Sequence, residues 1–195
     1  MDSPEDFDFT EVVERARTGD GAAFETLFRR FNQPVAAFAT ARRASDPEGV
    51  VNEVFIRVFR NLPTFEGTET QFSAWIFRIA RNLVIDEVRR QSRRIDEVSG
   101  PVFERTSNRA VDPHTSSGNP EQEVINTESD ALVSYLDHLT AEQRDVILLR
   151  VVADQSIEVV AATLGKSIAA VKSIQYRATR QLRDVLEKKS DLGAT

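Results

Sequence analysis

Apolar residues in the first half of the chain recur at the spacing of α-helices. Between residues 24 and 38 they follow one another in steps of three and four, which places them on one face of a helix. Residues 46–62 carry apolar side chains over a wide arc, and Pro47 suits the first turn of such a helix. A third segment, residues 71–94, has two apolar faces with a polar stripe between them. The pattern therefore predicts three helices in this half.

The second half of the chain carries a series of helix start and stop signals. Apolar residues mark a helix at 132–139, and Thr140-Ala-Glu-Gln143 has the spacing of a capping box, in which both side chains satisfy free backbone amides. Ser156 can cap a short helix, Gly165 suits its left-handed end, and Ser167 can cap a final long helix. No segment alternates as a strand does, so the predicted fold class is all-α.

Residues 96–128 have the composition of a flexible linker. They contain three prolines and two glycines, and their few apolar residues follow neither a helical nor a strand period. Phenylalanine is also unevenly distributed, because eleven of the twelve lie before residue 80. We therefore predict two small helical domains with differently built cores, at residues 1–95 and 129–195.

Composition excludes several classes of protein. The 195 residues include no cysteine, which excludes disulfides, thiolate metal sites and cysteine nucleophiles and indicates a reducing compartment. No run approaches the roughly 18 apolar residues of a membrane span, and the acidic N-terminus has no signal-peptide core. The two histidines lie 24 positions apart, and no glycine-rich phosphate-binding motif occurs. We expect a cytoplasmic protein that is not an enzyme, with no cofactor, no metal and no membrane partner.

Charge is distributed unevenly along the chain. The net charge of −6 argues against a free-standing nucleic-acid binder. Residues 96–130 alone carry eight acidic and two basic side chains, so much of the negative excess lies there. Between Lys166 and Lys189, seven basic side chains stand against two acidic ones. Local basic faces therefore remain available outside the predicted linker.

The strongest functional signal lies in residues 156–180. A short helix, a turn with glycine and a second helix are the parts of a helix-turn-helix, whose second helix enters the major groove of DNA. Small residues there allow close approach, and polar ones can donate to phosphates and bases. The alternative is an ordinary helical hairpin with a solvated basic face. At 100° per residue, the side chains that fall away from the buried stripe are Ala169, Lys172, Ser173, Tyr176, Arg177 and Arg180.

The polar stripe of residues 71–94 is a second candidate nucleic-acid surface. Cations and amides can hold a nucleic-acid backbone while an aromatic ring stacks on an unpaired base, and the preceding loop could wall a pocket for that base. Alternatively, the aromatic residue belongs to the core and the arginines only solubilise the helix. The stripe comprises Trp75, Arg78, Asn82, Asp86, Arg89 and Arg93.

Three segments, in this order, resemble the extracytoplasmic-function (ECF, group IV) sigma factors of the bacterial sigma-70 family. Their sequences are DPEGVVNEVFIRVFRNLPTFEG, FSAWIFRIARNLVIDEVRRQSRR and LTAEQRDVILLRVVADQSIEVVAATLGKSIAAVKS. The resemblance covers about residues 15–94 and 130–188. It implies a sigma-2 helical bundle and a sigma-4 helix-turn-helix domain joined by the linker. It also implies a protein that binds core RNA polymerase and directs promoter-specific transcription initiation, with promoter melting.

The resemblance assigns residues to three surfaces, and it places the helix at 141–152 near the polymerase flap. The expected contacts to the −10 element are Phe65, Gly67, Phe72, Trp75, Arg78, Asn82, Asp86, Arg89, Arg90 and Arg93. The expected contacts to the −35 element are Ser167, Ala169, Ala170, Lys172, Ser173, Tyr176, Arg177 and Arg180. The expected contacts to the clamp coiled coil of the polymerase are Asp46, Glu48, Val51, Asn52, Glu53, Phe55 and Val58.

Two positions depart from the family pattern. Gly49 stands where the docking motif usually has an acidic residue, and Ile174 stands where arginine is frequent.

The implied partners are core RNA polymerase, promoter DNA and an anti-sigma factor, since family members often have one. The alternatives are a stand-alone helix-turn-helix regulator and a sigma mimic that sequesters an anti-sigma factor. The first leaves residues 1–95 without a role, and the second needs no DNA-facing stripe.

Overall fold

The computed structural model describes residues 8–98 and 134–193, and within these ranges it contains helices and no strand. The prediction of an all-α fold is therefore confirmed. The predicted linker lies outside the described residues, apart from its first three positions, which continue the last helix of the first half. An N-terminal bundle consists of α1 (Phe9–Arg17), α2 (Gly21–Ala41), α3 (Pro47–Asn61), the 3₁₀ turn η1 (Leu62–Thr64) and α4 (Glu69–Val98). A C-terminal domain consists of α6 (Ala141–Ile147), the π-helical turn η2 (Leu148–Val152), α7 (Ile157–Leu164) and α8 (Ile168–Gly193).

The first three helices each begin at an aspartate. The carboxylates of Asp8, Asp20 and Asp46 each accept a hydrogen bond from a backbone amide of the following turn, at 2.8 to 2.9 Å. A negative charge at this end of a helix also interacts favourably with the helix dipole. The apolar pattern did not predict α1, although its three buried residues lie four and three positions apart on one face.

Phenylalanine fills the core of the N-terminal bundle. Phe38, Phe72 and Phe77 are all fully buried, and the rings of Phe38 and Phe77 meet edge to face with 6.1 Å between centroids. This geometry brings the positive edge of one ring to the negative face of the other, which is favourable. The uneven distribution of phenylalanine along the chain therefore reflects the packing of this bundle.

The start and stop signals predicted for the C-terminal domain are confirmed. Gln143 N donates to Thr140 Oγ1 at 3.3 Å, and Thr140 N donates to Gln143 Oε1 at 2.9 Å, which is the capping box. Ser156 caps α7, Ser167 accepts from an amide in the first turn of α8, and Gly165 ends α7 with φ of 64°. The helix predicted after the capping box is not α-helical throughout, because it passes into η2.

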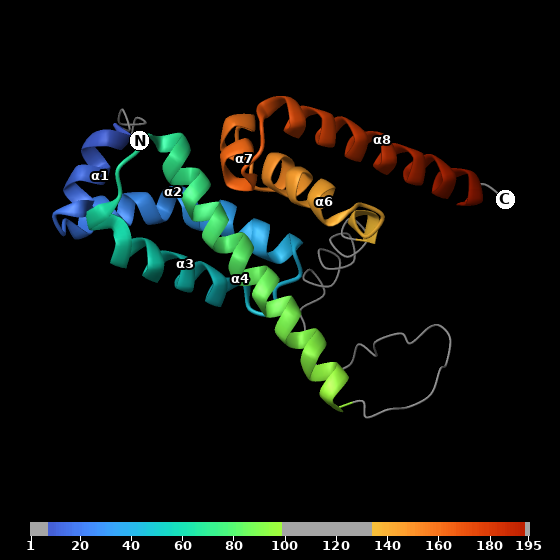
Figure 1. Ribbon diagram of the computed structural model, residues 1–195, viewed down its shortest axis with the longest axis horizontal. Helices are drawn as coiled ribbons and strands as arrows, with labels where there is room; N and C mark the ends of the chain where they lie inside the picture. The colour runs from blue at the N-terminus through green and yellow to red at the C-terminus, as the bar shows by residue number, and fades with distance from the viewer. Residues whose placement is uncertain (1–7, 99–133, 194–195) are drawn as a thin grey trace.

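The two domains pack against each other along α4 (Figure 1). Helix α7 lies beside α4, and η2 contacts α2. Buried side chains from both domains form one continuous cluster, which includes Phe38 and Phe77 of the bundle and Leu149 and Val160 of the C-terminal domain. The two cores differ in composition, as the sequence predicted, but they are joined, because each domain presents part of its apolar surface to the other.

The substitution Gly165→Ala should lower the free energy of unfolding by about 1–2 kcal/mol, because alanine is strained in the left-handed conformation of this helix end. Gly21→Ala is the matched control: neither site has an atom within 4 Å of an added Cβ, but only Gly165 has a positive φ. Chemical denaturation followed by circular dichroism measures both variants. Equal unfolding free energies for the two would contradict the role of Gly165 as a left-handed helix end.

Candidate nucleic-acid interface

A stacked aromatic pair lies at the N-terminal end of α4. The planes of Phe65 and Trp75 differ by only 10°, and their centroids are 5.3 Å apart. Trp75 is half-buried, so part of the indole is open to solvent. Phe72 lies against both rings, with its centroid 5.1 Å from Phe65 and 5.8 Å from Trp75. Because Phe72 itself is fully buried, its predicted contact with DNA is corrected: it supports the pair from the core side.

Gly67 allows the loop before α4 to close tightly. A Cβ at this position would lie 2.8 Å from the side-chain oxygen of Gln71 and 3.0 Å from the ring of Phe65. Gln71 also accepts a hydrogen bond from Thr68 N at 2.8 Å, which fixes the loop at the start of the helix. The absence of a side chain at Gly67 therefore leaves space for the Phe65 ring to stack on Trp75.

The polar stripe of α4 is open to solvent over the part whose side chains are described. Asn82, Asp86, Arg89 and Arg90 are all exposed, and Arg90 Nε donates to the backbone oxygen of Asp86 at 3.2 Å. Arg93 lies within α4, but its side chain is outside the described part of the structure. The stripe thus offers an amide and cations at helical spacing beyond the aromatic pair.

The outward face of α8 carries the side chains that the helical period placed there. Ile174 is 4% exposed and belongs to the core with Val171 and Ala178. The departure from the family pattern at Ile174 is therefore an inward position, and it removes no side chain from the outward face. Ala170 is half-buried, whereas the other predicted contacts are exposed: Ser167, Ala169, Lys172, Ser173, Tyr176, Arg177 and Arg180.

Helix α3 divides the predicted polymerase contacts into two groups. Val51, Phe55 and Val58, three of the predicted polymerase contacts, are buried in the bundle and present little or no surface to a partner. The small remaining surface of Val51 lines a groove of about 270 Å³ between α2 and α3. The other four predicted contacts lie at the surface: Asp46, Glu48, Asn52 and Glu53.

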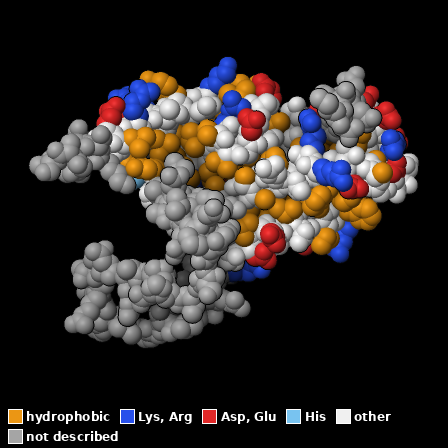
Figure 2. All heavy atoms as spheres, turned by 180° about the vertical axis from the view of Figure 1, so that it is seen from behind, with side chains coloured by type: hydrophobic (Ala, Val, Ile, Leu, Met, Phe, Trp, Pro, Cys, Tyr) orange, Lys and Arg blue, Asp and Glu red, His pale blue; other side chains and the backbone are white. Residues whose placement is uncertain are grey.

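Two exposed apolar side chains on α3 were missed by the sequence prediction. Ile56 is 44% exposed and Phe59 is 58% exposed. The wide apolar arc of residues 46–62 was the signal that could have identified them. A helix with one buried face needs apolar residues on that face only, so a wider arc leaves some of them exposed. Figure 2 shows apolar side chains gathered along the lower edge of the N-terminal bundle on the rear face of the molecule.

The space in front of Gly49 is filled by the carboxylate of Asp46. A Cβ added at Gly49 would lie 2.1 Å from Asp46 Oδ2, while Asp46 Oδ1 accepts from Gly49 N at 2.8 Å. A side chain at position 49 would therefore displace the Asp46 carboxylate that caps α3.

A buried aspartate connects the two domains. Asp145 of α6 is fully buried, with Oδ1 2.8 Å from Arg42 Nη2 and Oδ2 accepting from Arg81 Nε at 2.7 Å. Burial lowers the pKa of the Arg42 guanidinium; the Asp145 carboxylate opposes this effect, and the nearby Arg144 and Arg81 cations add to it. Both arginines belong to the N-terminal bundle, so the carboxylate is neutralised across the domain boundary.

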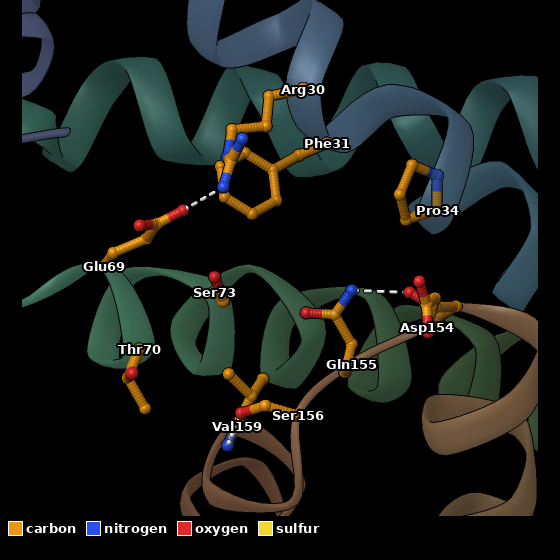
Figure 3. Close-up of a pocket in the computed structure, with 11 residues that line it drawn as sticks. Arg30, Phe31, Pro34, Glu69, Thr70, Ser73, Asp154, Gln155, Ser156 and Val159 are labelled. Carbon is orange, nitrogen blue, oxygen red and sulfur yellow. Dashed lines mark hydrogen bonds and ion pairs between the residues drawn. The ribbon is translucent and has the colours of Figure 1, made fainter. Parts of the chain in front are cut away.

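One predicted DNA contact is engaged within the protein. Arg78 Nη2 donates to the backbone oxygen of Ala162 in α7 at 2.7 Å. An open pocket of about 430 Å³ lies at the same junction, with α2 on one side and α4 together with the segment leading into α7 on the other (Figure 3). The sequence prediction missed this junction because its contacts join residues far apart in the chain; Arg78 and Ala162 are 84 positions apart.

Neither residues 8–98 nor 134–193 contain three or more histidine, aspartate or glutamate side chains grouped so as to hold a metal ion. None of the helices in these ranges is both long enough and apolar enough to cross a membrane.

Comparison with known proteins relates both domains to sigma factors. Residues 27–94 match Sigma-70 region 2, and residues 135–184 match Sigma-70 region 4. The chain is 30% identical over 181 residues to the ECF RNA polymerase sigma-E factor of Haemophilus influenzae, covering 91% of this chain and 93% of that protein. The chain belongs to the ECF RNA polymerase sigma factors. The region 2 match includes α3 and most of α4, and the region 4 match includes α6, α7 and most of α8.

Two further comparisons place this sigma factor within its family. It is 30% identical over 179 residues to the ECF RNA polymerase sigma factor BldN of Streptomyces coelicolor, which covers 90% of this chain. The chain spans 65% of the length of BldN, slightly less than two thirds. Its structure is similar to that of CnrH in complex with the cytosolic domain of CnrY, with a TM-score of 0.68, 25% identity, and coverage of 91% of this chain and 96% of CnrH.

The substitution Phe72→Ala should lower the free energy of unfolding of this sigma factor by about 3–5 kcal/mol, because it removes a fully buried ring and leaves a cavity. Asn82→Ala, on the exposed stripe of the same helix, should change it by less than about 0.5 kcal/mol. Urea unfolding curves of the two variants test the division of α4 into a core face and a surface face. Similar losses in both would show that this division is wrong.

Proposed function

We propose that this sigma factor binds core RNA polymerase, directs it to promoters with a −10 and a −35 element, and helps to open the DNA at the −10 element. The observation that carries the proposal is the presence of two different exposed surfaces in one chain. One is the polar stripe of α4 beside the Phe65–Trp75 stack, and the other is the basic outward face of α8. Two surfaces on two domains suit two separated DNA elements.

Stacking of an extruded base on Trp75 would stabilise the opened −10 element. Extruding a base costs a few kcal/mol, and stacking on an aromatic ring returns about 1–3 kcal/mol per base. The contact with Phe65 holds the indole in one orientation, so little side-chain freedom is lost when a base binds. Asn82 and Arg89 can donate to the strand that carries the base. This activity needs no catalytic residue, so the chain acts as a binding subunit and not as an enzyme.

The first turns of α8 suit the major groove at the −35 element. Ala169 leaves room for close approach of the helix, and Lys172 and Ser173 can donate to base edges and phosphates. Arg177 and Arg180 lie one and two turns further along and suit phosphate contacts, which set the register of the helix on the duplex.

Core polymerase would dock on α3. Exposed Ile56 and Phe59 provide apolar contact area, and Glu48 and Asn52 provide polar groups beside the groove between α2 and α3.

Docking on polymerase would also compensate for the weak DNA binding of an acidic chain. A chain with a net charge of −6 binds DNA weakly by itself, because the phosphate contribution scales with the cations engaged. Polymerase would hold both DNA-binding surfaces near their elements at high effective concentration.

Reading both elements requires the two domains to separate. The −10 and −35 elements lie about 25 base pairs apart, or roughly 85 Å of duplex at 3.4 Å per base pair. In the structure, α4 and α7 are in direct contact through Arg78 and Ala162. The closed arrangement would therefore be a state that precedes binding to the complete promoter.

An anti-sigma factor is a second proposed partner. The similar protein CnrH was solved in complex with the cytosolic domain of CnrY. A corresponding partner of this chain would cover the polymerase-facing surface of α3 and the DNA-facing surface of α4 or α8. Its place of action would be the bacterial cytoplasm, where core polymerase and the chromosome are found.

Run-off transcription with bacterial core polymerase on a pool of promoter fragments tests the proposal. Start-site-specific transcripts that require both core and this chain would support it. Binding to duplex DNA without any interaction with core would replace it with a stand-alone regulator. Binding to core without transcripts from any fragment would replace it with a sigma mimic. The same core preparation with an active sigma factor and its own promoter controls for polymerase activity.

The double substitution of Trp75→Ala and Asn82→Ala should reduce open-complex formation while leaving polymerase binding intact. Loss of about 1–3 kcal/mol of stacking corresponds to roughly 5- to 150-fold less open complex. Permanganate footprinting of the −10 region measures it, and Thr26→Ala, exposed on α2, serves as a control variant. Unchanged opening in the double variant would remove the proposed role of the stripe.

The substitutions Lys172→Ala and Arg177→Ala should weaken binding at the −35 element. Each lost phosphate contact should reduce the slope of log affinity against log salt by about one. Lys188→Ala removes the same charge from an exposed site further along α8 and should have a smaller effect. Footprints over the −35 element at several salt concentrations provide the measurement. An unaltered footprint in both variants would contradict the assignment of α8 as the DNA-reading helix.

A further inference from the structure

Three ion pairs join the two domains, and in all of them the cation comes from the same domain. Arg42 and Arg81 of the N-terminal bundle reach Asp145 of the C-terminal domain, at 2.8 and 2.7 Å. Arg43, in the turn after α2, lies 3.3 Å from Asp137 across the same boundary. In each of these contacts the cation belongs to the bundle and the carboxylate to the C-terminal domain. The two surfaces are therefore complementary in charge.

Asp145 is the central group of this boundary. Its carboxylate is 1% exposed, and both arginines that approach it come from the other domain. A carboxylate that is buried without a partner is strongly unfavourable. When the domains separate, Asp145 becomes hydrated and the arginines return to solvent. The charge of Asp145 therefore matters in the closed arrangement and has no comparable partner within the described part of its own domain.

We propose that Asp145 acts as a latch: its ion pairs with Arg42 and Arg81 hold the N-terminal bundle and C-terminal domain in a closed arrangement that cannot engage the two promoter elements together. This inference rests on the proposed function for its consequence in transcription, but the latch itself is a statement about conformation. The population of open chains, and with it the fraction of the sigma factor ready for promoters, depends on these two ion pairs.

The closed arrangement also occupies part of the DNA-facing stripe. Arg78 is one of the proposed −10 contacts, and its guanidinium donates to the backbone oxygen of Ala162. In this geometry Nη2 is committed to Ala162, and the side chain is held against α7. Opening of the latch therefore frees Arg78 as well as allowing the two DNA-binding surfaces to move apart.

The packing at the boundary suits a closure that can be reversed. Arg42 Nε and Asp145 Oδ1 are buried without a hydrogen-bond partner, so their ion pair is close but imperfectly satisfied. Such a pair returns only part of the cost of removing its charges from water. The junction also contains the open pocket shown in Figure 3, whose walls come from both domains. The two domains are therefore not in continuous contact at this part of the boundary.

Fluorescence energy transfer between the two domains tests the latch directly. The chain contains no cysteine, so Thr26→Cys on α2 and Asp184→Cys on α8 provide two exposed labelling sites in an otherwise unlabelled protein. Asp145→Asn should lower the energy transfer and raise the open-to-closed ratio by roughly tenfold or more, as expected for breaking a buried ion pair. Arg81→Gln, from the other domain, should shift the ratio in the same direction.

Two comparisons make the result specific. Glu11→Gln removes a carboxylate from an exposed ion pair with Arg15 within α1 and should leave the energy transfer unchanged. The combination of Asp145→Asn with Arg81→Gln should shift the ratio by less than the sum of the two single changes, because both remove the same contact. If Asp145→Asn impairs folding, as judged by helical circular dichroism, Arg81→Gln still decides the question.

The outcomes for the latch and for the proposed function are distinguishable. Unchanged energy transfer in folded Arg81→Gln, or a shift as large in Glu11→Gln, would overturn the latch whatever the transcription result. A lower energy transfer in both latch variants would support it. If the latch variants open and bind core but the chain supports no promoter-specific transcript, the proposed function fails and the latch stands.

Discussion

Helix α4 is packed from two sides, and the arrangement of the described chain depends on this. Its inward face fills the N-terminal bundle, and the neighbouring face carries Arg78 and Arg81 to the C-terminal domain. Only the remaining stripe is left for an external ligand. Because Arg78 belongs both to this contact and to the polar stripe, contact with the C-terminal domain and the proposed contact with DNA would compete for this part of the helix. The buried apolar residues of the inward face are Phe72, Ile76, Phe77, Ala80 and Val84.

This competition would link the affinity for promoter and polymerase to the equilibrium between the closed and open arrangements. A ligand that binds only the open chain has its apparent affinity reduced by the fraction of chains that are open. Polymerase and promoter would each favour the open arrangement, whereas a partner that grips both domains together would favour the closed one. The difference in affinity of each partner for the two arrangements sets its effect on the equilibrium. Regulation would therefore act through the domain boundary as much as through the DNA-binding surfaces.

Charge contributes to both arrangements. The chain is acidic overall, yet the cations at the domain boundary belong to the N-terminal bundle. In the closed arrangement the carboxylates of Asp137 and Asp145 neutralise them. Separation of the domains would uncover these cations beside the polar stripe of α4 and increase its attraction for phosphates. The basic outward face of α8 is exposed in the closed arrangement and does not depend on this change.

The sequence by itself determined the helical fold and most of the helix ends, because the signals for them act within one or two turns. The capping box at Thr140 and the left-handed turn at Gly165 need only neighbouring backbone groups, so their residue types were sufficient. The outward face of α8 was also predicted, since its period is regular and its core stripe is narrow.

The resemblance to sigma factors named the surfaces, but it did not separate Val51, Phe55 and Val58, which face inward, from Ile56 and Phe59, which face outward. On a helix that is apolar over a wide arc, only the packing of neighbouring helices decides this. The tertiary structure alone decided that the two domains meet, because the group that joins them, Asp145, finds its partners Arg42 and Arg81 more than sixty positions away in the chain. No local pattern carries that information, since the pairing depends on the paths of α2, α4 and α6 in space.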